Sequence, residues 1–464
     1  MLITIDCLRA DRLNPDAHPR RLAPHIEQLA ADSIRFRQAY ATGPRTAESF
    51  PAILASTYPM TFEGNWKLPE EVRTLARHLQ QSGFNTAAFH SNPFLSANLG
   101  YARGFDHFWD SREVTPLTSR MGDRLMRWVS PDSRLRRLLR RAARYFETRA
   151  NLAHYAPADT VTGEAMNWLA HRPTPFFAWL HYMDLHYPYA PPERHLHSIL
   201  PGGINKRLQA DLLVRSLEDP GSVSQTEAQL LRALYNAGLL YIDESVGQLL
   251  ASLSEMDLQD DTIVILTADH GEEFLEHGRF GHGGDIHVLQ EDRAQIRLFD
   301  ELLHVPLLVR PANESEWSRD VDTLVSLIDL PPTIVDLLGL KPAGQWQGRS
   351  LKALARGPAD PVREGVFSEY AIRAEAARYP VVSYRTSSWK FIYDGAFGRH
   401  HLYDLAADPT EQHNSYAADR PPAPELAQIV EEHLAEVCRF RTRDAEPELD
   451  PKTVERLRSL GYIE

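Results

Sequence analysis

Short apolar runs rich in β-branched and aromatic residues recur along most of the chain, and longer amphipathic segments separate them. Apolar runs bounded by polar residues are typical of strands buried on both faces of a parallel sheet. The intervening segments have apolar residues three and four positions apart, which favours helices packed against such a sheet. This alternation predicts an α/β domain with a doubly wound, mainly parallel sheet. We expect its strands at residues 2–6, 84–90, 176–182, 262–269 and 305–310, and its clearest helices at 24–33, 71–83, 158–172 and 225–253.

The pattern changes near residue 340, where closely spaced strand patterns replace the alternation. Closely spaced strands followed by one helix predict a small antiparallel α+β domain. We expect these strands at 365–370, 381–395 and 401–405 and the helix at 425–440. The predicted organisation is a catalytic α/β domain at 1–345, with a basic helical insertion at about 115–150, and a small C-terminal domain at 346–464.

Composition narrows the class of protein. The 464 residues carry a formal net charge of −13, and no apolar run approaches the roughly 20 residues that span a bilayer. We therefore expect a soluble protein that does not bind nucleic acid, because binding to phosphate backbones needs clustered Lys and Arg. Cys7 and Cys438 are too few and too far apart to indicate a disulfide framework. The first strand begins at once, so we expect a cytoplasmic protein unless a leader precedes this start.

One segment departs from the acidic average. Residues 120–149 contain ten arginines against three acidic residues, and leucines, Ala142 and Phe146 form an apolar stripe at helical spacing within 134–146. A solvated amphipathic helix explains this pattern. The alternative is peripheral contact with a membrane, through an anionic lipid, or with a polysaccharide, since basic amphipathic helices favour such interfaces.

Polar side chains follow the predicted strands at their carboxyl ends, where ligands bind in open α/β sheets. A single Asp or His at a strand end is often a turn or cap residue, but several together form a suitable ligand set for a divalent cation. His181 could also be a core histidine, and Asn92 a turn residue before Pro93. The strand-end residues are Asp6, His90, Asn92, His181, Asp269 and His270.

Several motifs make the chain recognisable. The stretches "LITIDCLRADRL", "SFPAILASTYP", "TADHGEEFLEHGRFGHGG", "ELLHVPLLVRP" and "LYDLAADPTEQHN" stand in this order. With these motifs the chain resembles the sulfatase family of the alkaline phosphatase superfamily, over residues 2–463. The resemblance implies an alkaline-phosphatase-like fold with a metal-centred hydrolytic site.

Roles for single residues follow from this resemblance. It implies Thr46 as the nucleophile, at the start of a helix and in contact with the metal, and one divalent ion that could be manganese, zinc or calcium. His186 and His282 are the expected proton donors to the leaving group, in preference to His277. The implied metal ligands are Asp6, Thr46, Asp269 and His270, and the implied substrate contacts are Asn92, His181 and His277.

The nucleophile position departs from the family. Standard sulfatases carry Cys or Ser in a Cys-x-Pro-x-Arg pattern and oxidise it to formylglycine, whereas this chain has Thr46 followed by Ala47, Glu48 and Ser49. Threonine is not a substrate for that conversion. Superfamily relatives with an unmodified threonine attack phosphorus, so the departure favours phosphoester chemistry. Ser49 is the rival nucleophile, one helical turn further along.

Two further features concern neighbours of the implied ligands. Cys7 stands where many relatives carry a second Asp or another polar ligand; its thiolate could favour zinc, but a lone cysteine usually has a packing role, which is what we expect. We expect Glu272, Glu273 and Glu276 to be solvated acids in a first helical turn.

The sequence thus predicts a metal-dependent hydrolase of phosphate, phosphonate or sulfate esters that acts through Thr46. The expected substrate is an anionic ester, glycan- or lipid-linked, and phosphodiesterase or phosphonate monoester hydrolase chemistry is favoured over that of a formylglycine sulfatase. Two alternatives stay open: a transferase of phospho-head groups to lipid or glycan, and a catalytically weak binding protein that retains the fold.

Overall fold

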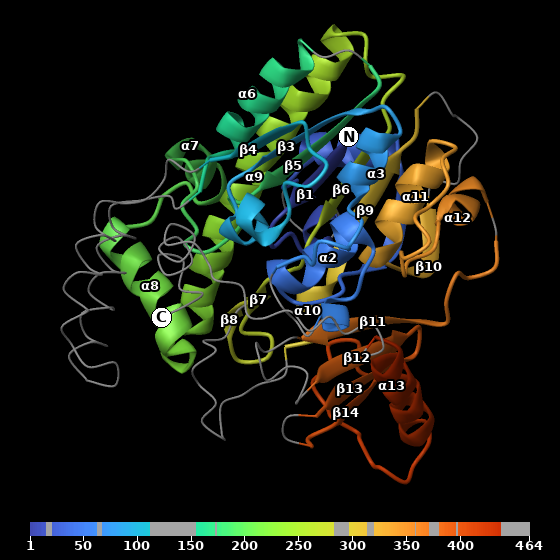
Figure 1. Ribbon diagram of the computed structural model, residues 1–464. Helices are drawn as coiled ribbons and strands as arrows, with labels where there is room; N and C mark the ends of the chain where they lie inside the picture. The colour runs from blue at the N-terminus through green and yellow to red at the C-terminus, as the bar shows by residue number, and fades with distance from the viewer. Residues whose placement is uncertain are drawn as a thin grey trace, which may run out of the picture.

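The computed structural model (Figure 1) describes most of the chain. The predicted basic insertion at 115–150, its membrane contact at 134–146 and the C-terminal tail lie outside the described residues. Within the described part, no helix is both long and apolar enough to cross a membrane. The described residues are 1–14, 21–62, 67–111, 155–171, 174–282, 297–312, 320–357, 359–370, 380–395 and 398–437.

An eight-stranded sheet forms the centre of the main domain. Its neighbouring strands are parallel except β9, which runs antiparallel to both β2 and β6. The mainly parallel sheet confirms the predicted fold class. Across the sheet the strands are β10 (Asp320–Ser326), β2 (Ile34–Tyr40), β9 (His304–Arg310), β6 (Val264–Ala268), β1 (Leu2–Ile5), β5 (Phe176–Tyr182), β3 (Asn85–His90) and β4 (His107–Asp110).

Helices cover both sides of this sheet (Figure 1). The helices α1, α6 and α7 pack on the long helix α9, which begins with a capping box between Ser224 and Glu227. On the other side, α3 and α11 pack on α2. The helices of the main domain are α1 (Pro24–Ala31), α2 (Thr46–Ala55), α3 (Leu75–Gln81), α6 (Ala158–Leu169), α7 (Glu193–Ile199), α8 (Lys206–Glu218), α9 (Gln225–Glu255), α10 (Asp300–Leu303), α11 (Leu330–Leu337) and α12 (Lys352–Arg356).

The C-terminal part forms the predicted small antiparallel sheet with one helix. Its strands pair in chain order, and α13 covers one face through a cluster that includes Val382, Phe391 and Val430. Alternate residues of the strands point to this helix, so the period-two pattern explains the packing. The elements are β11 (Gly365–Tyr370), β12 (Val381–Thr386), β13 (Trp389–Asp394), β14 (His401–Asp404) and α13 (Ala423–Val437).

A buried charge network joins the small sheet to the main domain. The Lys390 ammonium lies 2.8 Å from Asp300 Oδ1 and 2.7 Å from Glu411 Oε1, and Arg385 Nε lies 3.2 Å from Asp300 Oδ2. Burial acts to raise the pKa of Asp300, but the charges of Lys390 and Arg385 outweigh it and hold the pKa well below its usual range. The charges are therefore paired where water cannot screen them.

Replacing Lys390 by Met should lower the free energy of unfolding by about 3–5 kcal/mol, because it leaves the buried Glu411 without a cation and Asp300 with Arg385 alone. Urea denaturation measures this change. Lys352→Met is the matched control, since its partner Asp336 is 43% exposed and such surface pairs contribute about 0–1 kcal/mol. Equal losses in the two variants would contradict the account.

Candidate active site

Three adjacent strands bring acidic and imidazole groups to one edge of the sheet. Ile5 of β1 is in register with Ala268 of β6, so Asp6 and Asp269 follow at the same level. On the other side of β1, Thr4 is in register with His181 of β5. One ligand atom from each of Asp6, His181 and Asp269 lies within 4.8 Å of the other two. These side chains come together because the three strands are parallel, so that their carboxyl ends lie at the same edge of the sheet.

Thr46 is the first residue of α2 and lies against both carboxylates. Its Oγ1 donates to Asp269 Oδ2 at 3.1 Å, and it lies 3.4 Å from Asp6 Oδ2. The Asn92 amide, just after β3, donates to Asp6 Oδ2 at 3.2 Å and to Thr46 Oγ1 at 3.3 Å. The rival hydroxyl of Ser49 instead donates to the Gly43 carbonyl at 2.8 Å. Of the two hydroxyls, Thr46 is the one whose contacts lie within this cluster.

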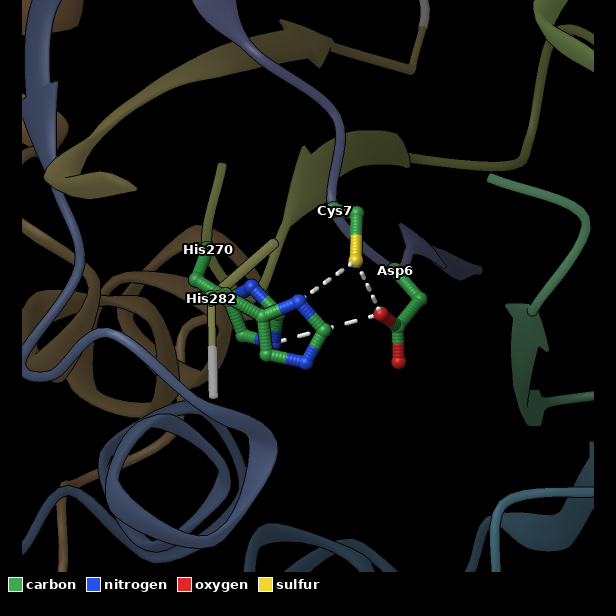
Figure 2. Close-up of side chains that lie close together, drawn as sticks. All are labelled: Asp6, Cys7, His270 and His282. Carbon is green, nitrogen blue, oxygen red and sulfur yellow. Dashed lines mark hydrogen bonds and ion pairs between the residues drawn. The ribbon is translucent and has the colours of Figure 1, made fainter. Parts of the chain in front are cut away.

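A second group, drawn in Figure 2, also contains Asp6. It consists of Asp6, Cys7, His270 and His282, all buried. The Cys7 thiol donates to Asp6 Oδ1 at 2.8 Å, and its sulfur lies 3.4 Å from His282 Nδ1. His270 Nε2 lies 3.4 Å from Asp269 Oδ2 and 3.9 Å from Asp6 Oδ1. Cys7 therefore contacts the polar cluster in addition to its expected place in the packed core.

The charges of this cluster fit a divalent cation. Burial raises the pKa of Asp269 to about 6, and the nearby charge of Asp6 adds to the increase. For Asp6, burial also acts to raise the pKa, but contact with His181 and the charges of His186 and His270 hold it well below its usual range. His270 Nε2 is fully buried and makes no hydrogen bond within the described residues. Oxygen and imidazole donors of this kind bind manganese or zinc.

The expectation for the acidic residues after His270 is wrong. Glu273 begins not a helix but a short strand, β7 (Glu273–Phe274), which pairs with β8 (Phe280–Gly281). Glu272 is fully buried, and Glu276 is paired with Arg9 at 2.7 Å. The repeated acids resemble a first helical turn in sequence, but side chains from distant segments partner them.

Glu272 forms a pair with His282 that the sequence did not indicate. Its Oε2 lies 2.6 Å from His282 Nδ1, and its Oε1 accepts a hydrogen bond from the Tyr189 hydroxyl. Burial raises the pKa of Glu272 to about 7. Burial also lowers the pKa of His282 well below its usual range, with further lowering from His270 and His186. These directions favour a protonated Glu272 beside a neutral His282.

The remaining expected site residues divide into two groups. His186 lies beside His282, with ring centroids 5.0 Å apart, and the rings of His282 and His270 are 4.2 Å apart. His277 lies elsewhere: it pairs with Glu301 at 2.5 Å, contacts the Glu411 carbonyl at 3.1 Å and stacks on Phe299. The structure therefore gives His277 a place at the domain contact and not in the cluster.

Comparisons with known proteins match most of the chain. The Sulfatase family model matches residues 1–340, and the model described as N-sulphoglucosamine sulphohydrolase, C-terminal, matches residues 293–439. Choline-sulfatase of Rhizobium meliloti is 25% identical over 455 residues, which cover 91% of this chain and 83% of that protein. Arylsulfatase K of Mus musculus is 30% identical over 204 residues, which cover 42% of this chain and 34% of that protein, so this match spans about a third of the relative.

Solved structures show the same fold. A phosphonate monoester hydrolase of Agrobacterium radiobacter superposes with a TM-score of 0.69 at 22% identity, over 94% of both chains. A structure described as bound to its substrate D-glucosamine-2-N,6-O-disulfate gives a TM-score of 0.68 at 19% identity, over 97% of this chain and 99% of that one. Matches that cover nearly whole chains support the fold as described.

Asp269→Asn should lower the affinity for Zn²⁺ or Mn²⁺ by at least about 10-fold, because even partners outside the ligand shell typically contribute that much. Isothermal titration calorimetry of the metal-stripped protein measures the affinity. His277→Gln is the control, since this histidine belongs to the same stretch of chain but contacts Glu301. An Asp269→Asn variant with unchanged affinity would show that the ligand assignment is wrong.

Proposed function

Since this chain belongs to the sulfatase family of hydrolases, whose model matches residues 1–340, we propose that it cleaves phosphate or phosphonate esters through Thr46, with sulfate esters as poorer substrates. One observation carries the proposal: the Thr46 hydroxyl lies 3.1 Å from Asp269 Oδ2 and 3.4 Å from Asp6 Oδ2. A hydroxyl is a weak nucleophile unless an adjacent base can take its proton, and here two carboxylates lie beside the hydroxyl at the start of a helix.

The residues around Thr46 support attack by an unmodified hydroxyl. Asp269 accepts its proton in a hydrogen bond, and the Asn92 amide fixes the oxygen from another side. The first backbone N–H groups of α2 and the helix dipole favour negative charge at this point, where an anionic ester would lie. A divalent cation held by Asp6, Asp269 and His270 would supply positive charge beside the hydroxyl, which favours its alkoxide form.

The proposed reaction has a simple balance of bonds. The O–H bond of Thr46 breaks and its proton passes towards Asp269, while the threonine oxygen forms a bond to phosphorus. The bond from phosphorus to the leaving oxygen breaks, and that oxygen takes a proton from His282. Because His282 Nδ1 lies 2.6 Å from Glu272, the proton held on Glu272 replaces the one given up. Water then releases the covalent ester from Thr46.

The substrate class is proposed from the shared chemistry of relatives. Relatives named as choline-sulfatase and as phosphonate monoester hydrolase differ in the central atom, but the sulfate and phosphonate groups in these names are both anionic. Threonine in place of the Cys or Ser that becomes formylglycine favours phosphorus over sulfur. We therefore propose an anionic phosphoester or phosphonate ester, glycan- or lipid-linked.

Thr46→Ala should lower kcat/KM on the preferred ester by at least about 10³-fold, because removing the nucleophile of other covalent hydrolases has a larger effect. The assay compares aryl phosphate monoesters, phosphodiesters, phosphonate monoesters and sulfate esters in the presence of Zn²⁺ or Mn²⁺. Ser49→Ala is the matched control and should retain turnover, since its hydroxyl contacts Gly43.

Each outcome of this assay has a definite meaning. Unchanged turnover by Thr46→Ala would contradict the nucleophile assignment. Faster cleavage of sulfate than of phosphorus esters, still dependent on Thr46, would contradict the substrate preference alone. Turnover that appears only when an acceptor alcohol is added would favour a transferase over a hydrolase.

His282→Gln should lower turnover by roughly 10²–10⁴-fold for esters with alkyl leaving groups, which need a proton to depart. Aryl esters with acidic leaving groups, such as p-nitrophenyl esters, should be affected much less. A plot of log kcat/KM against leaving-group pKa measures the difference. His277→Gln should leave the slope of the plot unchanged, and an equally unchanged slope for His282→Gln would contradict its role as proton donor.

A further inference from the structure

The Cys7 side chain is fully buried and belongs to both the apolar core and the polar cluster. Figure 2 shows its sulfur directed towards Asp6 and His282, and its distances to Asp6 Oδ1 and His282 Nδ1 are 2.8 and 3.4 Å. Asp6 has two oxygens with different neighbours: Oδ2 faces Thr46 and Asn92, whereas Oδ1 faces the sulfur. The sulfur and the Thr46 hydroxyl therefore contact different oxygens of Asp6.

An unusual backbone conformation directs the side chain there. Cys7 has a φ of +62°, in the left-handed region that residues other than glycine rarely adopt. Two hydrogen bonds stabilise this conformation: the Cys7 N–H donates to Asp269 Oδ1 at 3.4 Å, and the Tyr235 hydroxyl donates to the Cys7 carbonyl at 2.7 Å. Retained backbone strain of this kind is concentrated at functional sites.

A second, independent observation concerns His270. Its Nε2 is fully buried, makes no hydrogen bond to any described residue, and lies 3.4 Å from Asp269 Oδ2 and 3.9 Å from Asp6 Oδ1. One ligand atom from each of Asp6, Cys7, His270 and His282 lies within 4.8 Å of the other three. Ligand atoms around a four-coordinate zinc ion, with bonds of about 2.0–2.3 Å, are roughly 3.3–3.8 Å apart. For Asp6, Cys7 and His270 to reach such distances, the sulfur would move away from Asp6 Oδ1, now at 2.8 Å, and His270 Nε2 would move slightly closer to it, from 3.9 Å.

We propose that the Cys7 sulfur is a direct ligand of the metal, beside Asp6 and His270, and that it makes the centre selective for zinc over manganese and calcium. The inference rests on the metal centre of the proposed function. When the cation binds, the S–H bond breaks, the proton leaves to solvent, and the sulfur forms a bond to the metal. Sulfur is a soft donor, which favours Zn²⁺, whereas carboxylate and carbonyl oxygens suit Mn²⁺ and Ca²⁺.

X-ray absorption at the zinc edge of the full-length, zinc-loaded protein tests this directly. We expect a sulfur neighbour at about 2.3 Å in addition to nitrogen and oxygen neighbours at about 2.0 Å. Cys7→Ser should lose the sulfur neighbour and lower the ratio of Zn²⁺ to Mn²⁺ affinity by at least about 10-fold. Cys438→Ser is the control, because it removes the other cysteine of the chain and should leave the sulfur signal intact.

A second variant guards against a folding defect in Cys7→Ser. Cys7→Asp restores a negatively charged ligand, and Asp tolerates a positive φ better than most residues; it should bind Mn²⁺ without any sulfur signal. A zinc site with only nitrogen and oxygen neighbours in the unsubstituted protein would overturn the inference, as would a sulfur signal that persists in Cys7→Ser.

Failure of this inference and failure of the proposed function are distinguishable. A sulfur neighbour in a protein that cleaves none of the esters would support Cys7 ligation and contradict the function. Turnover that depends on Thr46, in a protein whose zinc has no sulfur neighbour, would support the function and contradict Cys7 ligation.

Discussion

Two buried carboxylates, Asp6 and Asp269, are the constraint on which the rest of the site depends. They follow adjacent parallel strands in register, so the sheet itself fixes their separation. Both are fully buried, and an oxygen of one lies within 4.8 Å of an oxygen of the other. Two negative charges this close are unfavourable without a counter-charge. The neighbouring groups meet that need: histidines approach from β5 and β6, and Thr46 donates a hydrogen bond. A cation binding site and an activated hydroxyl follow from the same electrostatic requirement.

The outer parts of the fold hold this arrangement in place. The strand pair β7–β8 carries Glu272 and His282 to the cluster, and the small C-terminal domain contacts the turn between those strands. Gln412 donates to the Glu276 carbonyl at 3.3 Å, while His277 contacts the Glu411 carbonyl. Glu411 in turn belongs to the buried network of Lys390. The docking of the small domain and the placement of the proton-donating pair are therefore linked through one loop.

Much of this could be predicted from the sequence, for physical reasons. The five strands expected from uninterrupted apolar runs are present, because both faces of those strands are buried. The pattern did not indicate β2, β4 and β10: β2 carries Arg35 and Arg37 next to the exposed Asp320, and β4 and β10 are edge strands. Strand-end residues such as Asp6 and Asp269 were identified because parallel strands end together. The Glu272 pair was missed because it forms only when the β7–β8 hairpin brings His282 back to Glu272, and because Tyr189, which also contacts Glu272, is far away in sequence.

The central claim, attack by Thr46 on the ester, is tested most directly by trapping the covalent intermediate. The protein is mixed with a fast-reacting aryl phosphate or phosphonate ester and quenched with acid within the first turnover. Digestion and mass spectrometry then locate the transferred group. The account predicts a phosphoryl or phosphonyl group on Thr46 that appears before product and disappears when substrate is exhausted. The group on Ser49 or on a histidine, or full turnover with no labelled peptide at any time, would contradict it.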